Sequence, residues 1–288
     1  MPRVLLPLLA ALTLLALGCQ ESGFNESKET EKPLKVQHRL GETKVPGQAE
    51  RPITLTTATL DDTLALGVRP LRAATPFGGT PPPYLIAKVP GVKWIRPVTA
   101  ATVPSLEAAD PDLILGGASR QGRLYDDLSR IAPTVMIDGA GSQWKLDLRL
   151  VGEALGRTND AEQLLTDYDA AAARTRRAIR RTMGPGKPRV ALVEVARNGL
   201  RAAPRDSFAG TILADAGLKQ VTKYTPRTEV DLLLLAEGPT ARSVVDGGFF
   251  RADYGLWWGD GGALAARVAL AQLRQAVAHA PARPSVNR

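Results

Sequence analysis

The sequence of 288 residues contains one cysteine, two histidines and few aromatic residues (5%). A single cysteine excludes a disulfide framework and any zinc or iron–sulfur site built from cysteines. The two histidines, His38 and His279, stand near opposite ends of the chain, so we expect no histidine-rich metal site. Because no histidine lies between them, we also expect no Ser-His-Asp triad in the body of the chain.

Motifs of nucleotide-binding and hydrolytic enzymes are also missing. Residues 186–188 are Gly-Lys-Pro, which excludes a P-loop, and Gly139-Ala140-Gly141 is not followed by the third glycine of a dinucleotide fingerprint. Ser119 is not set in a G-x-S-x-G elbow. A carboxylate pair for glycoside hydrolysis has no fixed spacing and is not excluded. We therefore expect a protein without catalytic residues, with an envelope enzyme on a carbohydrate or phosphate ester as an alternative.

Basic residues outnumber acidic ones, 37 to 29, which gives a net charge of +8. This excess is compatible with a nucleic acid, a membrane surface, an acidic ligand, or only a solvated arginine-rich surface. The length predicts two domains, since a domain commonly has about 100–200 residues.

An uncharged apolar run, Val4 to Leu17, follows Arg3. It is shorter than the roughly 20 residues of a transmembrane helix and is typical of a secretory signal. Leu15 to Cys19 resembles the lipobox of bacterial lipoproteins. We predict a signal peptide over residues 1–18 and a lipid such as palmitate on Cys19. An ordinary signal peptide with an incidental cysteine is the alternative.

Residues 19–35 are polar, charged and almost free of large apolar side chains. Such a segment cannot bury a core, so it predicts a flexible tether between a lipid anchor and a globular body. An anchored body lies outside the cytoplasm, which argues against nucleic acid as a partner. Removing residues 1–18 takes away only Arg3 among the charges and leaves +7, one less than +8.

Apolar or β-branched runs alternate with helical patterns from residue 50 onward. The predicted strands are 52–57, 71–75, 112–117 and 134–138, and the predicted helices are 58–66, 105–109 and 121–130. This alternation predicts βαβ units and a mostly parallel sheet in a first lobe, residues 36–142.

Residues 143–184 have a helical pattern instead. Trp144, Leu148, Val151 and Leu155 recur at helical spacing, and a second helix is predicted from Asn159. It continues for about 24 residues, or roughly 36 Å, which is long enough to connect two lobes.

A second α/β block is predicted over residues 185–288. Its predicted strands are 189–195, 230–235 and 243–246, and its predicted helices are 207–216 and 260–278. The predicted fold class is therefore α/β, with two lobes of mostly parallel sheets bridged by one long helix.

Five segments in this order resemble ferric-siderophore-binding proteins of ATP-driven (ABC) importers: residues 38–46, 59–70, 106–114, 128–135 and 152–157. The resemblance is strong over residues 36–183 and moderate to residue 217. It implies two α/β lobes joined by one helix, with the ligand in a cleft between them. One departure concerns the second lobe, where only residues 236–242 separate two predicted strands, so this lobe is expected to be shortened.

The resemblance implies a substrate-binding lipoprotein on the outer face of the cytoplasmic membrane. It would capture an iron(III)-siderophore and deliver it to an ABC permease and its ATPase, as a monomer without a cofactor. Receptors for cobalamin or haem are alternatives in the same fold, haem being disfavoured by the missing histidine. Zinc or manganese is disfavoured more strongly for the same reason. A non-transporting envelope adaptor is a further alternative. The sequence does not distinguish hydroxamate, catecholate and carboxylate siderophores.

Members of this family hold the chelate through arginine and aromatic side chains. The ligand residues implied here are Tyr84, Trp94, Arg96, Ser119 and Arg120 in the first lobe, and Arg197, Arg201, Tyr254 and Trp257 in the second. Trp257 and Trp258 are adjacent, so at most one of them is expected to face the ligand. Trp144 is expected in the core.

Docking to the permease in this family uses one acidic residue on each lobe. The resemblance implies Asp61 or Asp62 on the first lobe, and Asp206 or Asp215 on the second. The alternative is that these aspartates cap helices or interact with helix dipoles.

Overall fold

The computed structural model describes residues 32–74, 81–196, 199–237 and 249–279, all within one compact unit that starts at Glu31. The predicted signal peptide, Cys19, most of the tether, Arg197 and the predicted strand 243–246 lie outside the described residues. Among the described residues, no helix is both long and apolar enough to span a bilayer.

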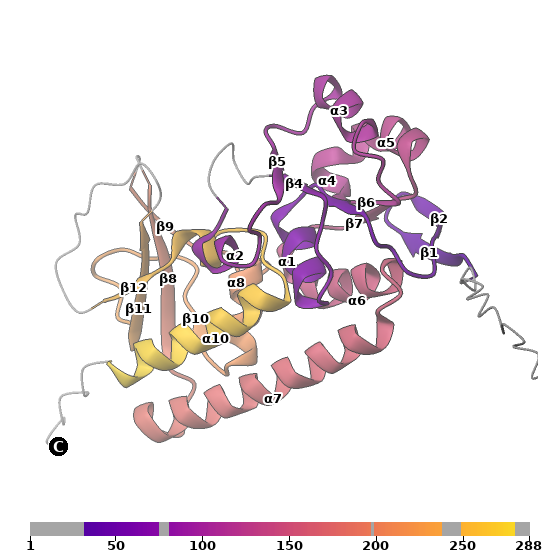
Figure 1. Ribbon diagram of the computed structural model, residues 1–288. Coiled ribbons are helices and arrows are strands. Elements are labelled where there is room, and N and C mark those ends of the chain that lie inside the picture. Colours follow the sequence, from indigo (N-terminus) through magenta and orange to yellow (C-terminus); the bar gives the residue numbers. More distant parts are fainter. Residues whose placement is uncertain (1–31, 75–80, 197–198, 238–248, 280–288) are drawn as a thin grey trace, which may run out of the picture. The chain divides into compact units, whose positions relative to one another are not determined.

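The first lobe contains a five-stranded sheet that is parallel throughout (Figure 1). Its strands lie in the order β5 (Lys93–Ile95), β4 (Arg72–Ala74), β3 (Pro52–Thr54), β6 (Leu113–Gly117) and β7 (Thr134–Ile137). The central strands β3 and β6 are completely buried, as their apolar sequences require. An antiparallel hairpin, β1 (Leu34–His38) and β2 (Gly41–Val45), precedes this sheet.

Short helices follow the strands of this lobe. They are α1 (Thr57–Ala65), α2 (Pro83–Ile86), α3 (Val103–Glu107), α4 (Ala118–Gln121) and α5 (Tyr125–Ile131), with 3-10 turns at Ala100–Thr102, Gly122–Leu124 and Gly141–Gln143. Thr56 caps α1 through a reciprocal pair of hydrogen bonds with Thr59. The helix predicted over 121–130 is divided in the structure between α4, a 3-10 turn and α5.

Two helices connect the lobes, α6 (Trp144–Ala154) and α7 (Thr158–Met183). The 26 residues of α7 span about 39 Å at 1.5 Å per residue. Its buried residues lie along one side and include Leu165, Tyr168, Ala172 and Ile179. Figure 1 shows α10 (Ala263–Ala278) lying along α7, which it contacts.

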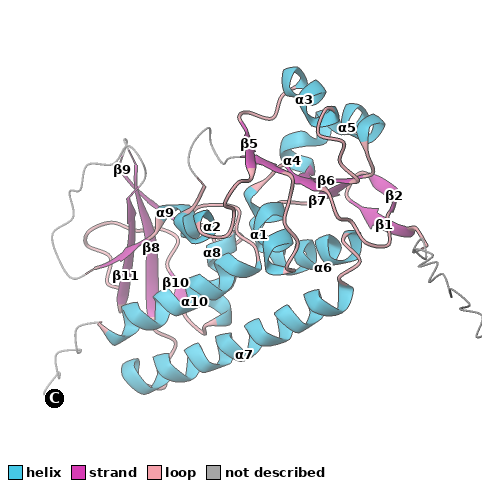
Figure 2. Cartoon of the chain, in the orientation of Figure 1, coloured by secondary structure: helices cyan, strands magenta, loops and turns pink. Residues whose placement is uncertain are grey.

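The second lobe has a sheet of parallel strands in the order β10 (Lys219–Gln220), β8 (Arg189–Ala196), β11 (Leu232–Glu237) and β12 (Phe250–Ala252). A further strand, β9 (Gly199–Ala202), pairs with β8 in antiparallel orientation. The helices are α8 (Phe208–Asp215), α9 (Tyr254–Trp257) and α10. Figure 2 shows this sheet apart from that of the first lobe. Because residues 238–248 are outside the description, the shortening of this lobe stays a prediction.

One hydrophobic cluster extends through both lobes and the connecting helices. It includes Leu113 of β6, Trp144 of α6, Leu192 of β8 and Leu270 of α10. The predicted fold class, two α/β lobes with mostly parallel sheets and one long bridging helix, is confirmed. The residue boundaries proposed for the lobes stay a prediction.

Candidate functional site

The carboxyl ends of the first sheet carry three of the predicted ligand residues. Arg96 directly follows β5, and Ser119 and Arg120 lie in α4, which follows β6. Two strands separate β5 from β6, so these positions are about 14 Å apart at the usual strand spacing. All three side chains are exposed. The edge of this sheet can therefore offer separate hydrogen-bond donors to a bulky oxygen-rich ligand.

Arg120 reaches across to the second lobe. Its Nη2 lies 2.6 Å from Oδ2 of Asp260, which stands shortly before α10. The two side chains keep 44% and 30% of their surface exposed, so water screens this ion pair. The pair joins the carboxyl edge of the first sheet to the second lobe.

The second lobe contributes a charged pair on its sheet. Glu194, 6% exposed, is the one charged residue in the buried part of β8, and its carboxylate accepts a 2.7 Å hydrogen bond from Nε of Arg201. Arg201, one of the predicted ligand residues, lies on β9 directly opposite Glu194 in the register. Its guanidinium is therefore paired, which reduces its capacity to bind a ligand alone.

Aromatic residues lie next to this charged pair. The phenol of Tyr254 has a raised pKa because it is partly buried and faces Glu194. The Tyr254 ring stacks on that of Trp258, with centroids 6.2 Å apart and planes at 11°. Both side chains are half-buried, so this stack is the aromatic surface that the second lobe can present to a ligand.

Trp257 does not belong to that surface. It is only 3% exposed, and its indole Nε1 donates a 2.9 Å hydrogen bond to Gln272 of α10. The neighbouring residue, Trp258, keeps the partly exposed position. At most one of the two was expected to face the ligand, and in this structure it is Trp258 that remains available.

Asp61 and Asp62 of α1 are completely buried. Asp61 accepts hydrogen bonds from the backbone N–H groups of Leu264 (2.7 Å) and Ala265 (3.0 Å), and Asp62 accepts one from Ala263 (2.9 Å). The two carboxylates of the first lobe therefore cap the N-terminus of α10 in the second. The prediction that they dock a permease does not fit this structure, because no arginine of a partner could reach them.

Burial controls the protonation of this pair, which we call the junction carboxylates. Desolvation raises the pKa of Asp61 to about 6, although the amide hydrogen bonds oppose the shift. Burial and the negative charge of Asp61 raise the pKa of Asp62 well above its ordinary value. Gly262 packs so closely on both carboxylates that a Cβ atom there would collide with them.

Tyr84 and Trp94, two predicted ligand residues, pack near the junction carboxylates. Tyr84 belongs to α2, which contacts α10, and its buried hydroxyl lies beside Asp61. Trp94 is half-buried and packs with Leu85 and Val92. Neither side chain is presented freely at the edge of the sheet.

Trp144 joins the connecting helix α6 to the second lobe. Its Nε1 donates a 3.2 Å hydrogen bond to Thr211 of α8, and its ring meets those of Tyr168 and Phe208 edge to face. The expectation that Trp144 belongs to the core is met by its 1% exposure.

The backbone of the loop after β7 is hydrogen-bonded to a buried carboxylate. Asp147 accepts hydrogen bonds from the backbone N–H groups of Asp138 (3.1 Å) and Gly139 (3.3 Å). Burial raises the pKa of Asp147 to about 6. This residue fixes the loop that ends the last strand of the first sheet.

The two acidic residues predicted for docking on the second lobe differ in environment. Asp215 accepts a 2.8 Å hydrogen bond from the hydroxyl of Tyr168 and lies 3.0 Å from Nζ of Lys145. Asp206 is exposed just before α8. Its role in docking stays a prediction.

Two residues at this site were missed from the sequence: Glu194 and Asp260. Glu194 could have been identified from the sequence, since a single charge within an apolar strand needs a partner. The pairing of Asp260 with Arg120 has no local signal in the sequence, because the two residues are 140 positions apart. The described residues contain no group of three His, Cys, Asp or Glu side chains arranged to hold a metal ion.

Comparison with family models gives one match. The model described as "Periplasmic binding protein" matches residues 53–233, more than half of the chain.

Curated relatives agree with that match. The chain is 30% identical over 219 residues to a probable siderophore-binding lipoprotein, YfiY, of Bacillus subtilis, covering 75% of this chain and 66% of the relative, just under two thirds of its length. It is 29% identical over 170 residues to the achromobactin-binding periplasmic protein of Dickeya dadantii, covering 58% and 55% of the two chains.

Solved structures share the fold. SirA of Staphylococcus aureus, complexed with staphyloferrin B, superimposes with a TM-score of 0.72 at 22% identity, covering 85% of this chain and 98% of SirA. A periplasmic solute binding protein of Mycobacterium smegmatis gives a TM-score of 0.71 at 22% identity, covering 86% and 98%.

Proposed function

The chain belongs to the periplasmic binding protein family, and we propose that it captures an iron(III)-siderophore between its lobes and delivers the chelate to an ABC permease. The ligand would be cargo, bound without covalent chemistry, and no protein atom need touch the iron. The proposal also includes anchoring through a lipid on Cys19 and action as a monomer.

One observation carries this proposal: the two sheet edges offer complementary chemistry. The first edge presents the exposed guanidinium groups of Arg96 and Arg120, and the second presents the stacked rings of Tyr254 and Trp258. Guanidinium groups donate to the anionic oxygens of a ferric chelate, and aromatic rings pack on its organic body. The Arg120–Asp260 ion pair connects the first edge to the segment before α10 in the second lobe.

The names of relatives support the class of ligand. One is a probable siderophore-binding lipoprotein, another an achromobactin-binding protein, and SirA was crystallised with staphyloferrin B. The word lipoprotein in the first name also supports an anchor at Cys19. Among the acidic candidates of the second lobe, Asp206 has the exposure that a contact with permease arginines needs.

Native mass spectrometry tests the proposal most simply. The purified chain is mixed with hydroxamate, catecholate and carboxylate ferric siderophores, together with cobalamin and haemin. We expect one ferric siderophore to be retained, with quenching of tryptophan fluorescence. Retention of cobalamin or haemin alone would favour the alternative receptors. No retention at all, with a protein partner that co-purifies, would favour an adaptor without ligand.

A further inference from the structure

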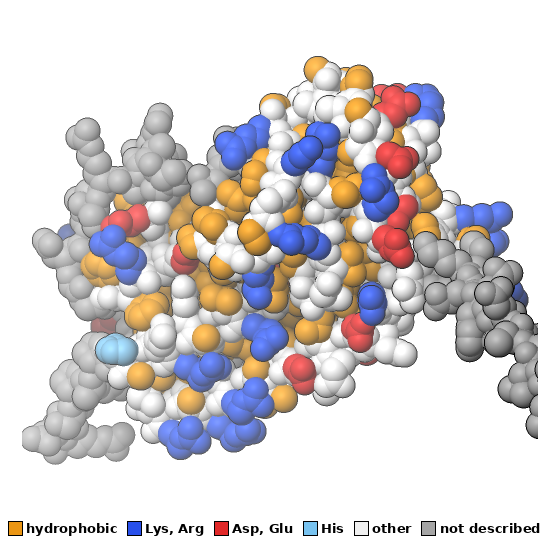
Figure 3. Space-filling view, viewed as in Figure 1, with side chains coloured by type: hydrophobic (Ala, Val, Ile, Leu, Met, Phe, Trp, Pro, Cys, Tyr) orange, Lys and Arg blue, Asp and Glu red, His pale blue; other side chains and the backbone are white. Residues whose placement is uncertain are grey.

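A strongly basic surface lies at the end of the second lobe where α7 finishes and β8 and β10 begin. We call it the basic surface. It consists of Arg174, Arg176, Arg177, Arg180, Arg181, Lys187, Arg189, Arg205, Lys219 and Lys223, all exposed. In Figure 3 blue side chains gather along the lower edge, where Figure 1 places α7 and α10.

Charge is segregated along α7. Its first half carries the acidic residues, Asp160, Glu162, Asp167 and Asp169, and its second half carries five arginines between positions 174 and 181. Arg174, Arg177 and Arg181 follow at helical spacing on the side opposite the buried residues. Arginines near a helix C-terminus interact favourably with the helix dipole. This effect explains the arginines in the last turn of α7 but not the others. Lys187, Arg205 and Lys219 lie outside α7 and need another explanation.

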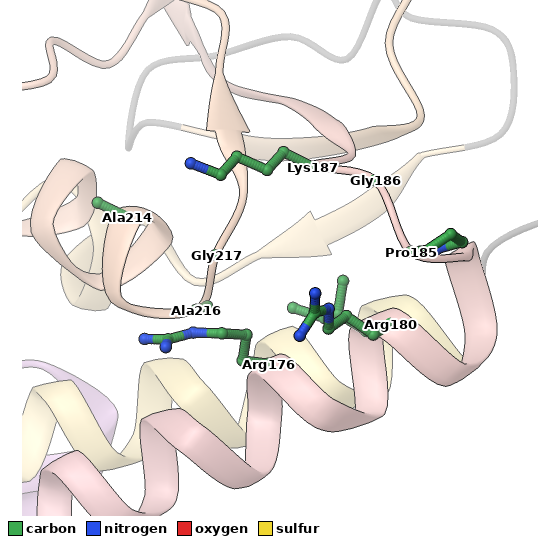
Figure 4. A pocket seen from close by; sticks show the side chains of 9 residues that line it. Arg176, Arg180, Pro185, Gly186, Lys187, Ala214, Ala216 and Gly217 are labelled. Carbon is green, nitrogen blue, oxygen red and sulfur yellow. The ribbon is translucent and has the colours of Figure 1, made fainter.

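Three adjoining hollows mark this surface. They measure about 400, 480 and 420 Å³. The first two share Lys187 in their walls, and the second and third share Arg205 and Lys219. Figure 4 shows the first of them, with Lys187 on one wall and Arg176 and Arg180 of α7 on the other. Among the described residues that line the three hollows, none is acidic.

The side-chain charges of the basic surface have few partners within the described part of the chain, although the Asp231 carboxylate accepts a 2.8 Å hydrogen bond from the backbone N–H of Arg189. Arg176 donates to the backbone carbonyl of Asp215, and Arg205 donates to that of Gln220. The ion pairs found in the described residues involve none of the ten basic side chains. A basic cluster of this size favours a partner with a dense negative charge.

The basic surface and the candidate ligand edge lie at opposite ends of the same sheet. Arg189 and Lys219 are the first residues of β8 and β10 and pair with each other in the register. Tyr254 follows the carboxyl end of β12, and β8 alone spans about 26 Å from one end to the other. A partner bound at the basic surface would therefore leave the ligand edge directed away from it.

We propose that the basic surface rests on the anionic phosphate headgroups of the membrane to which the chain is anchored, and thereby directs the ligand edges outward for capture. The anchor itself rests on the function proposed above. From Cys19 to Lys32 there are 13 steps of the chain, which reach about 45 Å when extended, and α7 is about 39 Å long. The body can therefore lie on its basic surface while anchored. Each Lys or Arg close to an anionic leaflet strengthens such a contact.

Lysine acetylation of the lipidated full chain on vesicles tests this orientation. The chain is reconstituted on phosphatidylcholine vesicles, or on vesicles with about 30% phosphatidylglycerol, and treated briefly with an acetylating reagent. We expect Lys187, Lys219 and Lys223 to react several-fold more slowly on the anionic vesicles only. The exposed Lys88 and Lys93 of the first lobe should react equally on both. Salt near 1 M should abolish the difference, because it shortens the Debye length to about 3 Å.

Two double variants provide a further test of the orientation. Arg177→Glu with Arg181→Glu should restore fast acetylation, whereas the matched variant Lys88→Glu with Lys93→Glu should not. Equal acetylation on both kinds of vesicle would overturn the proposal and leave an acidic protein as the partner to consider. Protection on neutral vesicles by inorganic phosphate alone would also overturn it, in favour of a small-anion pocket. Siderophore retention is measured separately and is unchanged in both variants, so this test can fail while the proposed function stands.

Discussion

The two parallel sheets place their charges at different ends. The first sheet carries two exposed arginines, Arg96 and Arg120, at its carboxyl edge. The second sheet has an aromatic stack and the paired Glu194 and Arg201 toward that end, while the cations of the basic surface lie at the amino end. We infer a division of labour in which the first lobe binds the anionic oxygens of a chelate and the second packs on its organic body.

The two lobes also meet in two different ways. At the junction carboxylates, Asp61 and Asp62, fully buried carboxyl groups hold the N-terminus of α10 by hydrogen bonds. At the sheet edge, Arg120 and Asp260 form a pair that water reaches. A buried contact of this kind fixes the lobes, whereas a screened pair can open to admit a ligand at little cost.

Gly262→Ala should have the largest effect, because the new Cβ would collide with both junction carboxylates. We expect the free energy of unfolding to fall by about 2–4 kcal/mol, as overpacking adds to lost hydrogen bonds. Urea unfolding measures this. Gly186→Ala is the control, since Gly186 has open space around it and should change stability by less than about 0.5 kcal/mol. Equal effects would show that the junction does not fix the lobes.

Arg96→Ala should weaken binding of the retained ferric siderophore by roughly 10-fold or more, because a charge-assisted hydrogen bond contributes about 1.5–3 kcal/mol. Lys93→Ala removes a nearby exposed positive charge on the same strand and is the control, with an expected change of less than about twofold. Fluorescence titration gives both dissociation constants. If both variants lose affinity equally, general charge and not a specific donor attracts the ligand.

Asp62→Asn should flatten the pH dependence of stability. The raised pKa values of Asp61 and Asp62 mean that the folded state retains protons which the unfolded state has released above about pH 4. The free energy of unfolding therefore falls as pH rises through about 6. Each retained proton changes it by about 1.4 kcal/mol per pH unit.

The comparison is made by unfolding both proteins in urea at pH 5 and pH 7.5. The free energy of unfolding should fall between pH 5 and pH 7.5 in both proteins. We expect this fall to be smaller by about 1 kcal/mol or more in the Asp62→Asn variant. Asp147 and His38 titrate in both proteins and cancel in the comparison. An unchanged loss would contradict the assignment of the pair.

Arg120→Ala should change stability least. Its pair with Asp260 is partly exposed, so we expect a loss below about 1 kcal/mol in urea unfolding. If Arg120 also contacts the ligand, the variant should lose more binding free energy than folding free energy. A stability loss as large as that of Gly262→Ala would instead make this pair a structural clamp.

Local patterns were sufficient for most of the fold. Buried strands such as β6 and β8 are apolar runs, and α7 has a long stripe at helical spacing, so both are visible in the sequence. The hairpin β1–β2 and strand β9 were missed because each strand is short and largely exposed, which leaves little apolar signal.

The site was harder to predict, because it depends on contacts between distant segments. Nothing near Asp61 indicates that its partners are amides 203 and 204 positions away. The choice between Trp257 and Trp258 likewise depends on Gln272, which lies on another helix. Sequence patterns place a residue at the edge of a sheet, but they do not tell which neighbour its side chain will meet.

Hydrogen–deuterium exchange of the full chain, with and without the retained ferric siderophore, tests the central claim most directly. If the ligand binds between the two edges, the amides of residues 95–96 and 118–121 in the first lobe and 250–258 in the second should all exchange more slowly in its presence. Protection of one lobe alone, or of neither, would contradict a shared site at the two sheet edges.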